Sequence, residues 1–179
     1  MTILQDIFRY FAKYPSEAAI AKIFTKTASN DPQYQSLRDA TIAKSSAIFP
    51  AITDYIFGVN EEAVKRRISQ VKGIYLFVDY GNISSMTSSK GVKEDSFQLA
   101  VTVAKPVSSA TFDQAEDILI AEQLLEIIQT IRRDLREDRS DPFVQRLSFP
   151  NDITPFFARE LSNSYGWTLM FQMRGVDMV

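Results

Sequence analysis

The chain has 179 residues, a hydrophobic content of 45% and a formal net charge of −2, values that are typical of one globular domain. It contains neither cysteine nor histidine, so disulfides, zinc fingers and Ser-His-Asp or Cys-His catalysis within the chain are excluded. The balanced charge gives no sign of a nucleic-acid-binding patch, and no segment reaches the roughly 18 consecutive apolar residues of a membrane span. We expect a cytoplasmic protein that binds neither nucleic acid nor membrane.

The first 70 residues are predicted to be helical throughout. In residues 2–14 apolar side chains recur every four residues, which predicts an amphipathic helix that Pro15 ends. Asn60, followed by two glutamates, is typical of a helix start, because its side chain caps the first turn and the carboxylates favour the helix dipole. Region 1–70 is either a helical layer of the same domain or an arm that docks on another subunit. The predicted helices lie at about 2–14, 18–27, 33–48 and 60–70.

Two strand-like segments open the remaining part of the chain, residues 71–179, which we expect to form the core. Residues 74–80 are apolar on both faces, which predicts a central strand buried on both sides. Residues 96–104 alternate between large apolar side chains and small or polar ones, which predicts a half-buried antiparallel strand. The Ser- and Gly-rich segment 81–91 is predicted to be a long, mobile hairpin loop between them.

A long amphipathic helix is predicted over about 111–137, with Thr111 or Asp113 as its cap. Its apolar arc is wide enough to lie across a sheet. Residues 153–174 are predicted to form a closing hairpin, whose first strand lies at an edge because it contains Pro155. The predicted fold is therefore α+β: a mainly antiparallel four-stranded sheet in β-β-α-β-β order, with one long helix packed on a face and a helical N-terminal region before it.

Carboxylates are the candidate metal ligands that this composition leaves. Asp79 ends the predicted central strand, where site residues are often presented, although it also suits a cap of the Tyr80-Gly81 turn. Asp113, Glu116 and Asp117 lie within one helical turn, where three acids could bind a divalent cation but also suit the helix dipole. No pair of carboxylates has a spacing that indicates glycosidase chemistry. We therefore predict no catalytic residue and no cofactor.

Surfaces for protein contacts are the second kind of candidate site. Gln98 and Thr102 lie on the small, polar face of the strand 96–104, which suits solvent or a subunit contact. Phe143 and Phe149 lie in a stretch expected to be irregular, residues 143–152, where they could anchor the segment onto the fold. We expect function at the sheet edges and in the loops 81–95 and 138–152, rather than in a pocket.

The order of helices, hairpin, long helix and hairpin resembles the small α+β tail-terminator and tail-completion proteins of tailed phages. Members of that group form rings by extending sheets across subunits, and they end the growth of the tail tube. The resemblance covers roughly residues 71–175. It rests on Tyr75-Leu-Phe-Val-Asp, Phe97-Gln-Leu-Ala-Val-Thr-Val, the helix at about 113–137 and Gly166-Trp-Thr-Leu-Met-Phe-Gln-Met.

The resemblance implies a non-enzymatic structural protein that self-associates, forms a homo-oligomer with other structural proteins as partners, and belongs to a phage or phage-like particle. Two alternatives are open. The first is a cytoplasmic binding module, a monomer or dimer with a pocket between helix and sheet. The second is a metal-dependent enzyme that uses Asp79 or the acids of residues 113–117.

Overall fold

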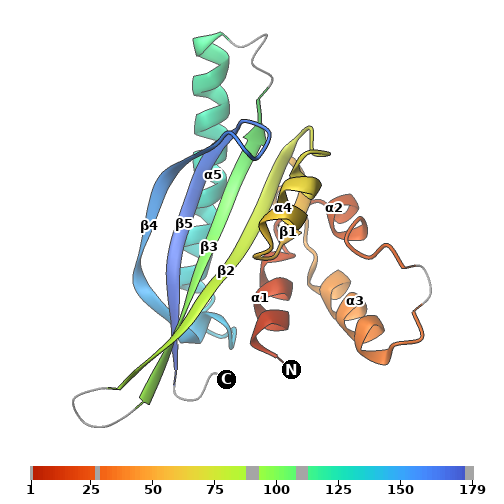
Figure 1. Ribbon diagram of the computed structural model, residues 1–179, viewed down its shortest axis with the longest axis vertical. Helices are drawn as coiled ribbons and strands as arrows, with labels where there is room; N and C mark the ends of the chain where they lie inside the picture. The colour runs from red at the N-terminus through yellow and green to blue at the C-terminus, as the bar shows by residue number, and fades with distance from the viewer. Residues whose placement is uncertain (1, 27–28, 88–92, 108–112, 176–179) are drawn as a thin grey trace.

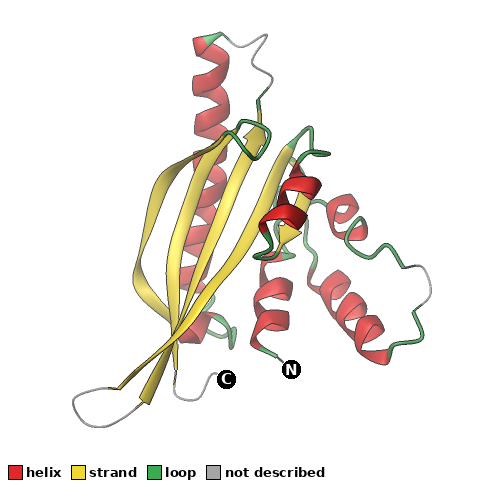
Figure 2. Ribbon diagram, viewed as in Figure 1, coloured by secondary structure: helices red, strands yellow, loops and turns green. Residues whose placement is uncertain are grey.

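The computed structural model describes residues 2–26, 29–87, 93–107 and 113–175. These residues contain five α-helices and five strands. The strands form one sheet, and helices lie against both of its faces (Figures 1 and 2). The helices are α1 (Ile3–Phe11), α2 (Glu17–Ala21), α3 (Pro32–Lys44), α4 (Glu61–Ile68) and α5 (Gln114–Glu137), with a 3₁₀ turn at Val144–Arg146. The strands are β1 (Ile52–Phe57), β2 (Ile74–Thr87), β3 (Lys93–Pro106), β4 (Leu147–Ala158) and β5 (Ser164–Gly175).

The sheet has the strand order β1-β2-β3-β5-β4. β1 runs parallel to β2, and the other neighbouring strands are antiparallel. The predicted α+β class and the long helix are confirmed, whereas the four-stranded sheet and the wholly helical region 1–70 are wrong because β1 adds a fifth strand. Residues 52–57 form this strand because Ile, Thr, Tyr and Phe favour the extended backbone.

α5 covers one face of the sheet, called here the inner face (Figure 2). Asp113 caps the helix by accepting hydrogen bonds from the backbone N–H groups of Ala115 and Glu116, while Thr111 lies outside the described residues. Among the described residues, no helix is both long and apolar enough to cross a membrane. The buried side chains between α5 and the strands include Leu124, Ile128, Ile131, Leu99, Val101, Leu169 and Phe171.

α1 belongs to the same core as α5 and the sheet. Ile7 and Phe11 are fully buried, and the Phe11 ring lies 5.7 Å from Phe143 and 6.2 Å from Phe171, measured between ring centroids. The hydroxyl of Tyr55 on β1 donates a hydrogen bond to the Phe8 carbonyl at 2.8 Å. The N-terminal region thus contributes both a helix and a strand to the central core.

The opposite, outer face of the sheet is covered beside β1 and β2 by α4. Asn60 caps this helix, as predicted, by accepting a hydrogen bond from the Ala63 backbone N–H. Val64 and Ile68 of α4 are buried in a second apolar cluster, together with Tyr75 of β2. α4 therefore fixes the position of the β1–β2 side of the sheet from outside.

The hairpin between β2 and β3 is longer than predicted. Residues 81–87 continue β2 instead of forming a loop, and the register shifts between Tyr80 and Ile83. Ser and Thr side chains still allow an extended backbone, so the polar composition alone did not indicate a loop here. Of the predicted loop, residues 88–91 lie outside the described part of the chain.

The predicted closing hairpin is confirmed, with β4 at the edge of the sheet. The prediction of an irregular segment at 143–152 is wrong from Leu147 onward, because β4 begins there. The register of β4 against β5 shifts between Ser148 and Asp152. Pro150 lies inside this irregular stretch, where its missing N–H removes no regular ladder bond.

Candidate functional site

The open edges of the sheet are the surface features that stand out. β5 pairs with β4 on one side, and no strand within the described ranges pairs with β4 on the other. On this edge Phe157 is 64% exposed, which is unusual for a large aromatic side chain. In Figure 1, β4 bows away from β5 along the margin of the sheet. An open strand edge with an exposed aromatic residue is a template for pairing with another chain.

The other side of the sheet has a stepped edge. β1 pairs with β2 only as far as Phe57, which lies opposite Val78. Beyond that point residues 79–87 of β2 pair with β3 alone. Ile83 is 44% exposed in this free part. The sheet therefore offers a second open strand segment on the side opposite β4.

Asp79 lies within β2 and not at a turn, so the predicted cap of a Tyr80-Gly81 turn is wrong. It is the first residue of the free part of β2 and pairs with Ala100. Burial raises the pKa of the Asp79 carboxyl, because partial removal from water disfavours the charged form. Within the described part of the chain, Asp79 belongs to no group of three or more side chains that could hold a metal ion.

The three acids at the start of α5 do not assemble a metal site. The Asp113 carboxylate is occupied as the helix cap, and Glu116 and Asp117 lie in the first turn. No group of three or more acidic side chains within the described ranges could hold a metal ion. Their position fits an interaction with the helix dipole. Asp79 lies elsewhere, on β2.

The four predicted contact residues have different environments. Gln98 is exposed on the outer face of β3, whereas Thr102 is buried and its hydroxyl lies 2.7 Å from that of Thr168. Phe143 is buried in the aromatic core beside Tyr10 and Phe11. Phe149 belongs to β4, but its side chain lies outside the described part. Of these four, only Gln98 has a described side chain that is accessible to a partner.

A polar cluster joins the end of α1 to the end of α5. The Tyr10 hydroxyl donates a hydrogen bond to the Asp138 carboxylate at 2.9 Å, and the Lys13 ammonium pairs with the same carboxylate. Burial alone would raise the pKa of Asp138, but the hydrogen bonds from Lys13 and Tyr10 outweigh it and lower the pKa. All these groups satisfy one another, so the cluster is suited to holding two helices together.

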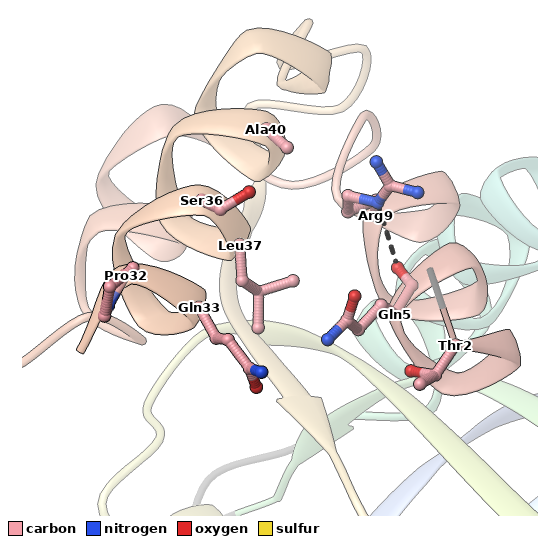
Figure 3. Close-up of a pocket in the computed structure, with 8 residues that line it drawn as sticks. All are labelled: Thr2, Gln5, Arg9, Pro32, Gln33, Ser36, Leu37 and Ala40. Carbon is pink, nitrogen blue, oxygen red and sulfur yellow. Dashed lines mark hydrogen bonds between the residues drawn. The ribbon is translucent and has the colours of Figure 1, made fainter.

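A cleft of about 450 Å³ separates α1 from α3 (Figure 3). Leu37 and Gln5 point into it from opposite sides. The cation in its lining, Arg9, donates to the Gln5 carbonyl at 3.2 Å and pairs with Asp6. The lining brings together no acid and base that could transfer a proton. The residues that line it are Thr2, Gln5, Arg9, Pro32, Gln33, Ser36, Leu37 and Ala40.

The edge of β1 was missed by sequence reasoning. Lys22 on the turn after α2 and Arg67 on α4 donate hydrogen bonds to the Thr53 and Phe57 carbonyls of this strand. The signal that could have found the strand is the enrichment of β-branched and aromatic residues from Ile52 to Phe57. Nothing in the sequence indicated which helices would flank it.

No protein-family model, no curated protein and no solved structure matches this chain.

Proposed function

We propose that this chain is a non-enzymatic structural protein that self-associates through the edges of its sheet, as a component of a phage or phage-like tail. The resemblance in the order of elements suggested this role. What supports it in the structure is the presence of two unlike open edges on one sheet. The proposal includes a homo-oligomer and further structural proteins as partners.

The observation that carries the proposal is the open edge of β4. A proline cannot donate to a strand ladder, so Pro155, paired with Trp167, directs its nitrogen to the open side. Residues two positions away in a strand point their backbone groups the same way. Ile153 and Phe157 therefore present their N–H groups to the open side. An edge with few donors and one exposed aromatic residue favours one partner register over many.

The free part of β2 is the complementary surface in this proposal. It lies across the sheet from β4, so a contact between β4 of one copy and residues 79–87 of the next is head-to-tail. Such a contact closes into a ring if the rotation between neighbouring copies is a whole-number fraction of a full turn. A continuous sheet would then run through the oligomer.

Composition argues in the same direction. The chain lacks histidine and cysteine, which removes the commonest general base and the thiolate nucleophile. The pocket between helix and sheet that a binding module would need is filled there by buried side chains of α5 and the strands. Neither alternative function gains a specific observation in its favour.

The proposal is tested by size-exclusion chromatography with multi-angle light scattering. The wild-type protein should form an oligomer of defined mass, and Phe157→Lys should shift the mass toward that of the monomer. Met170→Lys is the matched control: Met170 is 55% exposed but lies on the adjacent strand β5, away from the edge, and should leave the oligomer intact. Circular dichroism checks that both variants fold.

A wild-type protein that stays monomeric up to millimolar concentration would contradict self-association. An oligomer that survives Phe157→Lys but is lost in Met170→Lys would move the contact from the edge to the outer face of the sheet.

A further inference from the structure

The outward side of β1 lies at the bottom of a groove between α2 and α4. In Figure 1, α4 stands in front of β1 and α2 lies beside it. The groove has a volume of about 660 Å³, and residues of both helices and of β1 line it. We call it the β1 groove. It is a separate surface from the β4 edge and lies on the opposite side of the sheet.

The backbone groups of β1 alternate between the sheet and the groove. The register shifts between Ile52 and Asp54, and the Ile52 carbonyl accepts from the Ser16 N–H. Beyond this irregularity the Gly58 N–H donates to the Val78 carbonyl at 3.2 Å, so the even-numbered Asp54 and Ile56 point toward β2. The odd-numbered Thr53 and Phe57 point away, because their carbonyls accept hydrogen bonds from Lys22 Nζ at 3.0 Å and Arg67 Nη1 at 3.3 Å. Tyr55, between them, therefore presents both its N–H and its carbonyl to the groove.

Three backbone groups of β1 are thus available for pairing: the N–H and carbonyl of Tyr55 and the N–H of Phe57. Among the described residues, no hydrogen bond from a turn, a loop or a side chain reaches these three groups. An extended peptide that adds a strand beside β1 would satisfy all three, in the manner of β-strand addition. The five residues from 53 to 57 span about 13 Å, enough for a segment of about five residues.

The lining of the β1 groove selects the chemistry of that peptide. Its apolar part includes Ile23, Phe57 and Val71, on both sides of the strand. Its charged side chains are two cations, Lys22 and Arg67, and one anion, Asp54, which gives a net charge of +1. Asp54 is paired with Lys22 at 2.9 Å. An acidic segment with apolar side chains at alternate positions complements this surface.

The walls of the groove limit what can enter. α2 and α4 both pack against β1, so β1 is recessed between them. A single extended segment fits this space, whereas the edge of a second folded sheet would meet the two helices. The strands within the described ranges all pair in the sheet, so a second copy has none of them free to donate.

We propose that β1 accepts an acidic, extended segment of a different protein as an added strand, with Lys22 and Arg67 binding its carboxylates. This inference goes beyond self-association and does not depend on it, because it uses β1 and neither β4 nor the free part of β2. The simpler interpretation is that Lys22 and Arg67 only protect the edge from unwanted pairing. The two interpretations predict opposite results with a peptide.

The test uses a synthetic peptide of about seven residues, blocked at both ends, in which valine alternates with glutamate or threonine. Its binding to the full chain is followed by fluorescence anisotropy, and amide hydrogen exchange is followed by NMR. Saturable binding should slow the exchange of the Tyr55 and Phe57 amides relative to the free protein. The same peptide with lysine in place of glutamate should bind at least about tenfold more weakly, a difference of about 1.4 kcal/mol.

Variants identify the groove. Lys22→Glu with Arg67→Glu should weaken binding of the acidic peptide at least tenfold. Arg66→Glu with Lys72→Glu changes the net charge equally at exposed positions that do not line the groove, and it should bind within about twofold of the wild type. Lys22→Gln with Arg67→Gln gives an intermediate loss and guards against misfolding of the charge-reversed pair.

Three results would overturn the proposal. The first is an acidic peptide that does not bind, which favours simple edge protection. The second is binding that leaves the Tyr55 and Phe57 amides unprotected or is equally weakened by the control pair. The third is protection of these two amides that rises with protein concentration in the absence of peptide, which would make a second copy the occupant. None of these results depends on whether Phe157→Lys dissociates the oligomer.

Discussion

The two sides of the sheet end in different ways. On one side β1 is flanked by α2 and α4, and side chains from Lys22 and Arg67 bond two of its outward carbonyls. On the other side β4 has no flanking strand among the described residues, and its Phe157 is 64% exposed. A recessed edge admits a single segment, whereas an uncovered edge can meet the edge of another folded body. The same sheet thus offers two surfaces suited to partners of different shape.

The largest loss of stability is expected from a substitution that forces apart β3 and β5, two of the strands that lie between the two edges of the sheet. A Cβ at Gly166 of β5 would lie 2.0 Å from the Val103 carbonyl oxygen and 2.7 Å from the Ala104 Cα, and backbone atoms of a central strand cannot yield that far. Gly166→Ala should therefore lower the free energy of unfolding by about 3 kcal/mol. Urea denaturation measures it.

Gly81→Ala is the control for that substitution. The nearest atom to its Cβ would be the Gln98 carbonyl oxygen at 3.4 Å, close to ordinary contact distance. Its cost should stay below about 1 kcal/mol. Equal losses in the two variants would show that close approach of β3 and β5 is not what makes Gly166 necessary.

A smaller effect on stability is expected from removing the two cations beside β1. Lys22→Ala with Arg67→Ala should lower the free energy of unfolding by no more than about 1 kcal/mol, because the side chains are exposed. β1 remains recessed between α2 and α4, so other copies should still not pair with it, and light scattering at high concentration should equal that of the wild type. Increased scattering would mean that Lys22 and Arg67, rather than the helices, keep other copies from this edge.

The turn that leads into β1 contains a strained residue. Ala47 has φ of 46°, a left-handed conformation that costs a residue with a Cβ about 1 kcal/mol. Ala47→Gly should raise the free energy of unfolding by about 0.5 kcal/mol, because the greater freedom of glycine in the unfolded chain offsets part of the gain. Ala43→Gly, in the right-handed helix α3, should instead lower it by about 1 kcal/mol. Thermal unfolding measures the stability of both variants. A loss of stability in Ala47→Gly as large as that in Ala43→Gly would contradict strain at Ala47.

The smallest change in stability is expected at Asp79, the first residue of β2 beyond its pairing with β1. Its pKa is raised in the folded state by burial, so the folded protein binds the proton more tightly and loses stability as the pH rises through that range. Asp79→Asn should therefore stabilise the protein at pH 7, by less than about 0.5 kcal/mol because the half-exposed carboxylate remains partly hydrated. The difference should vanish below about pH 4. A difference that is constant from pH 3 to 7 would contradict this.

The parts of the fold that could be predicted depend on long, regular patterns. The apolar stripe of α5 and the alternation in β3 and β5 each extend over many residues, so the pattern outweighs local exceptions. β1 was missed because it has only six residues and lies among helices. Its burial on both faces, at Tyr55 and Ile56, removes the alternation that identifies a half-buried strand.

The candidate surfaces were harder to predict than the elements. Gln98 and Thr102 share one face of β3, but only the tertiary position of Thr168 determines that Thr102 is buried and bonded. Phe143 was predicted as a candidate contact residue that could anchor its segment onto the fold. It lies in the core, because Tyr10 and Phe11 of α1, far away in the sequence, pack against it. The exposure of Phe157 depends on which strand has no neighbour, and strand order is not encoded in any local pattern.

We propose β4 and the free part of β2, and not β1, as the self-association surfaces. Amide hydrogen exchange with mass spectrometry, measured over a hundredfold range of protein concentration, tests it most directly. Exchange in residues 152–158 and 79–87 should slow as the concentration rises, and exchange in β1 should stay the same. Unchanged exchange in both open segments, or slowing in β1 alone, would contradict the account.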